Sequence, residues 1–165
     1  IPLRLWHDHI LAKEPSTAGP TAFHQDQMKW PFDRVRHTLS VWIALQDTPV
    51  ERGCMSFLPG SYHREGLPNI GTADQDRWKI EAPDLAWQPQ LTVPLQAGDC
   101  TFHHGMIMHA AGPNLTEEWR VAHVVIFADR DAAYSGQAHL VTDPLELVVG
   151  QSLPDALFPP VGSTV

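Results

Sequence analysis

Short segments in which apolar side chains recur at every second position dominate this chain. Such alternation is typical of strands with one buried face, because successive side chains of a strand point to opposite sides. Arg120–Ala128 is the most convincing of them, since it is long, rich in β-branched residues and free of proline. His37–Gln46 alternates in the same way. Further strands are predicted at Leu3–Leu11, Cys54–Leu58, Leu91–Leu95, Cys100–His103 and Met106–Ala110.

Helical periodicity, by contrast, is not sustained in any segment. Asn69–Gln90 is polar and contains Pro83 and Pro89, so we expect a long loop with at most a short helix around Thr72–Trp78. A turn of helix is expected in the tail after Asp143. Fifteen prolines and eleven glycines agree with short strands joined by turns. The pattern predicts a mainly β fold with few short helices, of the sandwich, barrel or jelly-roll type.

A single domain is expected, because 165 residues are enough to bury one sizeable core. No apolar run approaches the roughly 20 residues of a membrane helix, so we expect no membrane partner. The net charge of −8 argues against a nucleic-acid partner, which would require basic patches. The chain begins at Ile1 rather than Met, and we expect residues 1–165 to be one domain that lacks an N-terminal region of a longer protein.

Two cysteines, Cys54 and Cys100, are too few for a disulfide scaffold. We interpret both as reduced core residues, because free cysteine is among the most buried residue types. Reduced thiols favour a cytoplasmic location.

The sharpest chemical signal is His24-Gln25-Asp26. In a strand, residues 24 and 26 would project from the same face, where an imidazole and a carboxylate can chelate a divalent metal. A distant histidine would complete a facial triad of two histidines and one carboxylate, which leaves coordination positions open and suits non-haem Fe(II). A His-x-Asp pair alone often arises by chance, so the rest of the chain has to supply support.

Three neighbouring histidines, His103, His104 and His109, are rivals for the third ligand. Arg120 favours His109, because a strand that returns after a turn at Gly112–Asn114 would pass His109 and set the guanidinium deep in the fold. A planar, permanently charged group is suited to hold the far end of a dicarboxylate. Alone, such an arginine is more often part of a surface ion pair. Other cations that could anchor a dicarboxylate are Lys13, Arg34, Arg36 and Arg52.

In these residues the chain resembles the phytanoyl-CoA dioxygenase family of Fe(II)- and 2-oxoglutarate-dependent oxygenases. The resemblance runs from about Ile1 to Asp129, and the order of the pieces is more specific than any one motif. The pieces are Leu5-Trp6-His7-Asp8, Lys13-Glu14-Pro15, His24-Gln25-Asp26, Trp42-Ile43-Ala44-Leu45, Gly53-Cys54-Met55-Ser56-Phe57-Leu58-Pro59-Gly60-Ser61, Gly98-Asp99, His109, Asn114 and Arg120.

The resemblance implies a double-stranded β-helix, the cupin-like jelly roll. It implies that His24, Asp26 and His109 bind iron. It also implies that Arg120 grips the distal carboxylate of 2-oxoglutarate and that Trp42 lines the co-substrate pocket. The implied reaction consumes O₂ and decarboxylates 2-oxoglutarate to succinate and CO₂. In the same reaction an unactivated C–H of a small organic substrate is hydroxylated or otherwise oxidised.

Two other functions stay open. A halogenase on the same scaffold needs an open iron position for chloride, usually made by losing the carboxylate, and Asp26 argues against it. The second is a non-catalytic jelly-roll protein that binds a metal. The chain departs from the family at Ala111, where members often carry a hydroxyl, so one co-substrate hydrogen bond is expected to be missing. The acidic balance and the many Trp and His residues favour a small polar or aromatic natural product over an acyl-CoA as substrate.

Several histidines are expected to lie outside this site. His7 and His9 share one strand face, and we interpret them as polar positions of a partly exposed strand, since no third ligand matches them. His123 is interpreted as a core or interface residue. Solvated loop positions are expected for His63 and His139.

Overall fold

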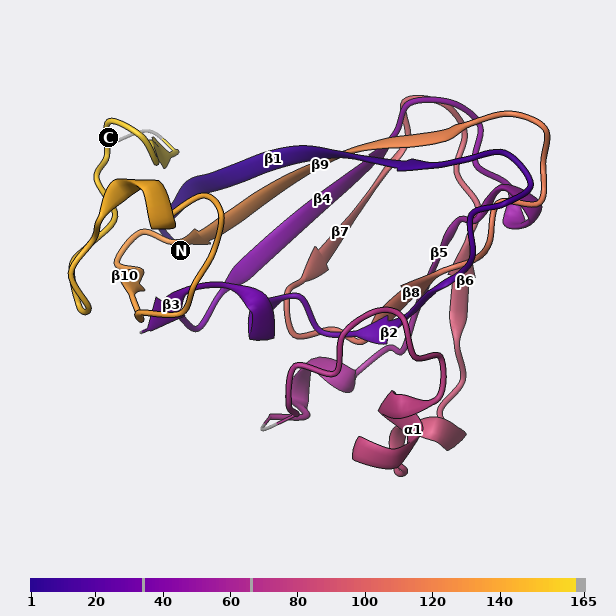
Figure 1. The fold of residues 1–165 in the computed structure, drawn as a ribbon, viewed down its shortest axis with the longest axis horizontal. Coiled ribbons are helices and arrows are strands. Elements are labelled where there is room, and N and C mark those ends of the chain that lie inside the picture. The colour runs from indigo at the N-terminus through magenta and orange to yellow at the C-terminus, as the bar shows by residue number, and fades with distance from the viewer. Residues whose placement is uncertain (34, 66, 163–165) are drawn as a thin grey trace.

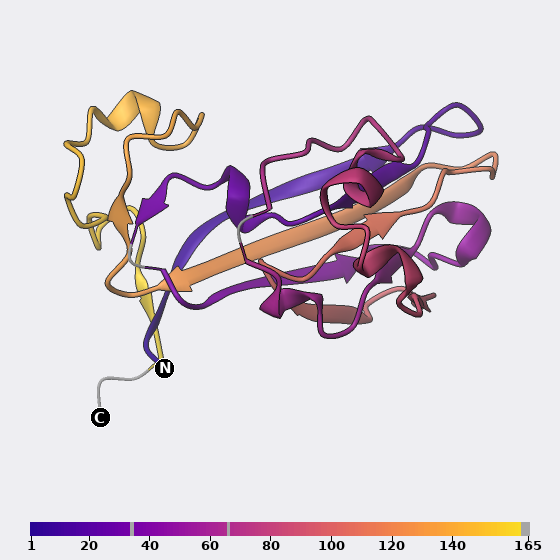
Figure 2. The same ribbon diagram turned by 90° about the horizontal axis from the view of Figure 1, so that it is seen from below.

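A computed structural model describes residues 1–33, 35–65 and 67–162 (Figures 1 and 2). As the alternation predicts, the chain is mainly β. The described strands are β1 (Leu3–Lys13), β2 (Thr21–His24), β3 (Phe32–Asp33), β4 (Thr38–Ala44), β5 (Met55–Phe57), β6 (Leu91–Val93), β7 (Cys100–His104), β8 (His109–Ala111), β9 (Arg120–Asp129), β10 (Ala133–Tyr134) and β11 (Pro160–Val161). The described helical segments are α1 (Arg77–Glu81) and single 3₁₀ turns at Gln27–Lys29, Val50–Arg52, Ser61–His63, Leu85–Trp87 and Asp143–Leu145.

Two antiparallel sheets enclose the interior. One has the strand order β11-β1-β9-β4-β7 and the other β2-β8-β5-β6, while β3 and β10 form a separate pair. In Figure 1 the two sheets form a wedge, and the loops at its right-hand end join β1 to β2, β4 to β5 and β8 to β9. The chain therefore passes repeatedly from one sheet to the other. This arrangement confirms the predicted jelly roll of the cupin-like kind.

Strand β9 shows why the sequence forms this interior. Arg120, Ala122, Val124, Ile126 and Ala128 are all buried, and the residues between them are less so. Its inward side chains meet those of β1, β4, β5 and β8 in the main hydrophobic core between the sheets. The burial of this strand alternates without a break, as a strand with one buried face requires, although its sequence is apolar on both faces except at Arg120, His123 and Asp129.

A second, smaller core lies where α1 and its flanking turns cover the sheet that contains β2. Trp78 of α1 packs there with Phe23, and their ring centroids are 5.0 Å apart. The helix was predicted at Thr72–Trp78 but begins only at Arg77. The reason is local, since the carboxylate of Asp74 accepts hydrogen bonds from the backbone N–H groups of residues 76 and 77 at 3.0 and 3.2 Å. This turn occupies the segment where helix was expected.

Two further predictions need correction. The strand expected at Met106–Ala110 begins only at His109, because Ile107 N–H closes a turn onto the His104 carbonyl at 2.9 Å. Cys54 is buried as predicted, but Cys100 is exposed on β7, which is an edge strand of its sheet. In the part of the chain that the structure describes, no helix is long and apolar enough to cross a membrane.

Candidate metal centre and co-substrate pocket

His24, Asp26 and His109 come together between the two sheets. His24 ends β2 and His109 begins β8, and the two residues are direct cross-strand partners. The His24 Nε2 atom lies 3.2 Å from one Asp26 carboxylate oxygen, and the His109 Nε2 atom lies 3.6 Å from the other. One candidate ligand atom from each residue lies within 4.8 Å of the other two. The structure thus brings together the three residues that the sequence proposes as metal ligands.

The geometry of this triad fits a first-row metal ion. Ligand atoms about 2.1 Å from an ion, at right angles to one another, are about 3.0 Å apart, which is close to the spacing found here. The Nδ1 atoms point away from the ion position: that of His24 lies 2.7 Å from the Ala22 carbonyl and that of His109 3.0 Å from the Ile107 carbonyl. A carbonyl accepts from an N–H, so each Nδ1 carries the proton and each Nε2 keeps its lone pair for a metal.

The protonation states also suit a metal. Burial lowers the pKa of His109 to about 3, so its ring is neutral at pH 7. Burial alone would raise the pKa of Asp26, but His109 and His24 more than offset it and hold that pKa well below its usual range. A carboxylate and a neutral imidazole are the forms in which Asp26 and His109 would bind a divalent ion.

The reason that we gave for pairing His24 with Asp26 is wrong. Strand β2 ends at His24, and Asp26 has helical backbone angles (φ −71°, ψ −42°) before the turn Gln27–Lys29. The two side chains converge because the chain turns, not because a strand alternates. Gln25 holds this turn in place, since its side-chain amide donates to the carbonyls of Met106 and Arg64 at 2.7 and 3.1 Å.

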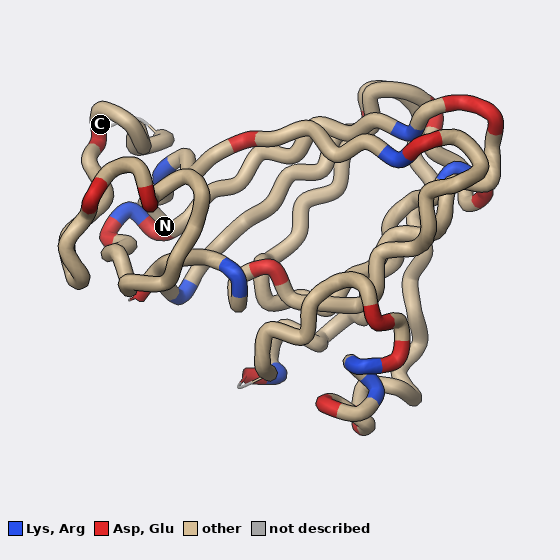
Figure 3. The backbone as a smooth tube through the Cα atoms, viewed as in Figure 1, with Lys and Arg blue, Asp and Glu red and all other residues tan. Residues whose placement is uncertain are grey.

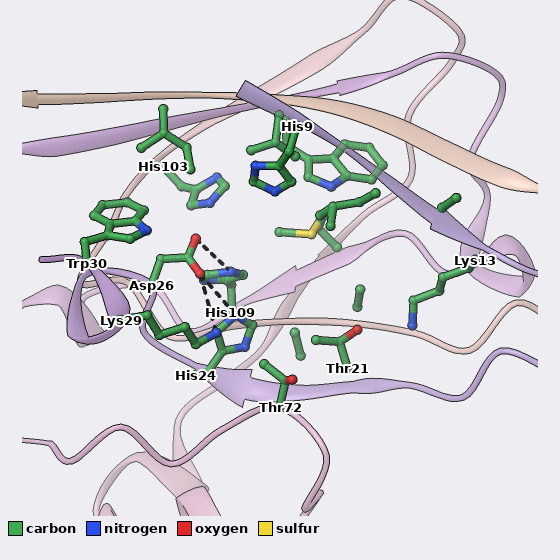
Figure 4. A pocket seen from close by; sticks show the side chains of 18 of the residues that line it. His9, Lys13, Thr21, His24, Asp26, Lys29, Trp30, Thr72, His103 and His109 are labelled. Carbon is green, nitrogen blue, oxygen red and sulfur yellow. Dashed lines mark ion pairs between the residues drawn. The ribbon is translucent and has the colours of Figure 1, made fainter. Parts of the chain in front are cut away.

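A cavity of about 430 Å³ contains the triad (Figure 4). Its size is typical of a small-molecule site, for which about 300–1,000 Å³ is usual. Six of the ten histidines line it, namely His7, His9, His24, His103, His109 and His139.

The cavity wall carries more basic than acidic residues, whereas the chain as a whole is negatively charged. The acidic residues of the chain lie mostly in loops and turns (Figure 3). Among the described residues of the wall, Asp26 is acidic whereas Lys13, Lys29 and Arg120 are basic. An anion that enters therefore meets an attractive surface, and the site would bind an acid more readily than the net charge of −8 suggests.

Arg120 lies at one end of this cavity and is 3% exposed. Its Nη1 donates to the Leu11 carbonyl at 3.3 Å, its Cζ lies 5.4 Å from the ring centroid of Trp42, and its Nε has no partner among the described residues. Burial lowers its pKa to about 10, so it remains charged at pH 7. The predicted route was wrong, however. Strand β9 pairs with β1 and β4 while β8 pairs with β2 and β5, so Arg120 faces His109 from the opposite sheet.

Lys13 is the second cation at this end. It is the direct cross-strand partner of Arg120 and is 7% exposed, and its Nζ donates to the carbonyls of Gly19 and Gly112 at 2.6 and 2.9 Å. Burial and the charge of Arg120 lower its pKa to about 8. Of the other candidate anchors, Arg36 is exposed, Arg52 pairs with Glu118, and Arg34 lies outside the described residues.

Sequence reasoning missed the inward direction of His7 and His9. Both line the cavity, although we interpreted them as ordinary positions of a partly exposed strand. A bulge between Leu5 and His7 shifts the register of β1, so that Trp6 and His7 both reach the interior. We recognised from the sequence that His7 and His9 share a face; the same alternation, continued to Lys13, could have shown that this face also carries Lys13.

Three other histidines can also be compared with their predictions. His139 is in a loop as expected, but it lines the cavity and its ring centroid is 5.2 Å from that of Trp6. His103, a rival for the third ligand, is buried beside His109 without joining the triad. His123 lies on the outer face of β9, where its Nε2 is 2.7 Å from an Asp8 carboxylate oxygen, and not in the core.

Comparison with known proteins decides the family. Residues 2–122 match the family model described as phytanoyl-CoA dioxygenase (PhyH), which is well over half of the chain. The chain belongs to the phytanoyl-CoA dioxygenase family. Among curated members, a phytanoyl-CoA dioxygenase domain-containing protein 1 homolog of Caenorhabditis elegans is 28% identical over 126 residues, covering 72% of this chain and 44% of its own length. A methylphosphonate hydroxylase of Gimesia maris is 32% identical over 122 residues, covering 72% of this chain and 43% of its own length.

Solved structures of the same kind are more similar still. The non-haem α-ketoglutarate-dependent carbocyclase SnoK from nogalamycin biosynthesis is 40% identical, with a TM-score of 0.85 over 98% of this chain and 63% of its own. The epimerase SnoN, solved with Fe³⁺, α-ketoglutarate and nogalamycin RO, is 40% identical, with a TM-score of 0.81 over 96% of this chain and 65% of its own. The predicted family is thus confirmed, and its neighbours are iron- and 2-oxoglutarate-dependent enzymes. The chain spans less than half the length of these curated relatives.

Proposed function

We propose that this chain is an Fe(II)- and 2-oxoglutarate-dependent dioxygenase that hydroxylates, or otherwise oxidises, an unactivated C–H of a small organic substrate. The observation that carries the proposal is one cavity that holds both a complete two-histidine, one-carboxylate triad and a pair of buried cations. A triad alone suits several metals and roles. The cation pair adds a site for a dicarboxylate beside it.

In this proposal each residue has one task. His24 and His109 offer their Nε2 atoms to iron, and Asp26 offers its carboxylate. Arg120 forms a charge-assisted contact with the distal carboxylate of 2-oxoglutarate, and Lys13 adds a second positive charge beside it. Trp42 packs its ring face against the Arg120 guanidinium, which supports the orientation of the anchor.

Trp42 is 2% exposed and also lines the cavity, so its indole forms part of the co-substrate wall. The iron, when bound, activates O₂ for the oxidation of a C–H while 2-oxoglutarate is decarboxylated to succinate and CO₂. The protein orients the substrate and the co-substrate and excludes water from the site. The buried side chains of the two sheets shield the site from solvent.

The substrate is proposed to be a small polar or aromatic natural product, because SnoK, from nogalamycin biosynthesis, and SnoN, solved with nogalamycin RO, each match nearly all of the chain at 40% identity. An acyl-CoA fits less well. Of the three basic residues on the cavity wall, the co-substrate would occupy Lys13 and Arg120, which leaves only Lys29 there, among the described residues, for the phosphates of coenzyme A.

The alternatives are weaker for specific reasons. A halogenase would need a coordination position for chloride in place of the carboxylate, and Asp26 occupies that place. A non-catalytic metal-binding protein would not require two buried cations next to the metal. Their burial without an acidic neighbour favours a site that is filled by an anion.

Succinate formation tests the proposal. Protein supplied with Fe(II), 2-oxoglutarate and air should form succinate slowly even without substrate, and the signal should depend on both iron and oxygen. His109→Ala and Asp26→Ala should reduce it to the level of free iron. Wild-type protein that forms no succinate above that level would refute the dioxygenase assignment.

The domain organisation also stays a proposal. We propose that residues 1–165 form one oxygenase domain and that an N-terminal region of the longer protein packs on it. The outer face of the larger sheet supports the second part, because Ile10, Leu45 and Phe102 are 56%, 50% and 67% exposed. These exposed apolar side chains are where we propose that this region packs.

A further inference from the structure

Two imidazoles beside the triad have no task in the proposed function. His103, on β7, is 6% exposed, and its ring centroid lies 4.9 Å from that of His109. His9, on β1, lines the same cavity. Both project from the larger sheet, whereas His24 and His109 belong to the smaller one, and Figure 4 shows Asp26 between the two groups. Neither His9 nor His103 belongs to the set of ligand atoms that meet at the triad.

Sheet register sets the direction of these two side chains. His103 pairs with Ser40 of β4, and Ser40 pairs with Ile126 of β9. Ile126 pairs in turn with His7 of β1, and His9 follows two residues further along the same strand. Residues two apart on a strand face the same side, so His9 and His103 both point from one sheet toward the metal site.

Each of these rings has a polar atom that the protein leaves without a partner. The Nδ1 atoms of His9 and His103 are buried and form no hydrogen bond with any described residue. Buried polar atoms are nearly always paired, so these two Nδ1 atoms need a partner that the described residues do not supply. A neutral imidazole offers one N–H donor and one acceptor.

The rest of the wall is aromatic and aliphatic. Trp30 and Trp42 line the cavity, as do Val124 and Ile126. A flat ring system fits between such side chains, and its oxygen substituents could reach the two imidazoles. A saturated acyl chain would cover the same surface but leave both Nδ1 atoms unpaired. A site built around hydrogen bonds rejects a substrate that lacks the matching group.

We propose that His9 and His103 are specificity-determining residues that hold a ring substrate bearing hydroxyl or carbonyl oxygens over the metal. The inference rests on the proposed function, because it places the substrate beside the bound iron and 2-oxoglutarate. It narrows the substrate class from small organic molecules to oxygenated ring compounds, and it assigns the hydrogen bonds that orient the C–H to be oxidised.

A pair of matched probes tests this assignment. Protein loaded anaerobically with Fe(II) and 2-oxoglutarate is titrated with 2-naphthol and with naphthalene, which differ by one hydroxyl. The ratio of the two dissociation constants measures how much the hydroxyl group contributes to binding. His9→Leu and His103→Leu should each reduce the preference for 2-naphthol roughly 10-fold, the size expected for a lost hydrogen bond in a buried site. His9→Asn and His103→Asn, which have nearly the same shape as leucine but keep a donor and an acceptor, should recover part of it.

The control variant is His123→Leu, which changes a histidine on the outer face of β9 and should leave the ratio unchanged. The visible charge-transfer absorption of iron chelated by 2-oxoglutarate is recorded in the same samples. If the absorption is present but both leucine variants keep the wild-type ratio, or the wild type shows no preference for 2-naphthol, this inference is overturned and the proposed function stands. If the wild type lacks the absorption, the proposed function itself fails.

Discussion

Lys13 and Arg120 lie directly opposite each other on β1 and β9, and both side chains are almost fully buried at 7% and 3% exposure. Burial lowers the pKa of both, and the charge of Arg120 lowers that of Lys13 further. Two like charges in a buried site repel each other, so an anion between them would relieve an unfavourable arrangement. The chemical identity of that anion therefore bears directly on the function of the site.

The first prediction is that affinity for 2-oxoglutarate falls as the pH rises through about 8, the pKa of Lys13. The dianion binds best when Lys13 is protonated, so its binding raises that pKa. Affinity is therefore full below pH 8 and declines between the pKa of the free protein and the higher pKa of the complex. Titration of the Mn(II)-loaded protein with 2-oxoglutarate at several pH values measures this pH dependence of the affinity. Lys13→Met should bind more weakly and lose the dependence, and an equally steep dependence in this variant would exclude Lys13 as its cause.

Arg120→Ala should weaken 2-oxoglutarate binding roughly 30-fold or more, because removing one partner of a buried charged contact costs about 2–5 kcal/mol. Metal content should stay near that of the wild type, since a guanidinium has no lone pair for iron. Arg120→Lys should recover little, because an ammonium lacks the planar fork. Calorimetry on metal-loaded protein gives the constants. Unchanged affinity in Arg120→Ala would transfer the anchor role to Lys13.

Asp26→Ala should lower metal affinity at least about 100-fold, more than the loss of an outer-shell group usually does, while the β-rich fold persists. The carboxylate is one of the three proposed ligands, but it is partly exposed and the turn around it is also held by Gln25. Metal content after dialysis and circular dichroism measure the two effects. Asp8→Ala, which removes a carboxylate on the outer face, is the control and should retain metal. Loss of the fold together with the metal would show that Asp26 has a structural role instead.

Asn114→Ala should destabilise the protein and weaken co-substrate binding. This fully buried amide donates to the carbonyls of Lys13, Glu14 and Glu118 at 3.2, 3.1 and 2.8 Å, and so ties the end of β1 to the loop before β9. Removing it leaves buried carbonyls unpaired, which we expect to reduce the free energy of unfolding by about 2–4 kcal/mol in urea denaturation. Asn69→Ala, at an exposed asparagine, should change stability little. Equal stability of the two variants would contradict this role.

The sequence predicted the fold, and it predicted that His24, Asp26 and His109 meet, because both leave strong local signals. The long, β-branched run of β9 is recognisable as a strand, and a His-x-Asp pair is readable without any tertiary structure. The family resemblance then indicated His109 and Arg120 as site residues. The reasoning that joined them in neighbouring strands was wrong, because the sheet that a strand joins depends on pairings between distant segments. Arg120 was assigned to a neighbour of β8, yet it faces the metal site from the other sheet.

The histidines of the cavity wall show a second limit. A bulge in β1 changes which residues face inward, and the sequence Leu5–His7 contains no glycine or other residue that would predict a bulge there. His139 reaches the cavity from a loop, where no periodicity applies. Side chains that contact a substrate are therefore harder to predict from the sequence than the ligands of its metal.

The most direct test of the central claim is the position of iron in a crystal grown anaerobically with Fe(II) and 2-oxoglutarate, located by anomalous scattering at the iron edge. We expect one anomalous peak about 2.0–2.2 Å from the Nε2 atoms of His24 and His109 and from an oxygen of Asp26, as is typical of such ligands. The distal carboxylate of 2-oxoglutarate should contact Arg120. A peak elsewhere, such as between His7, His9 and His139, or a co-substrate turned away from Arg120, would contradict it.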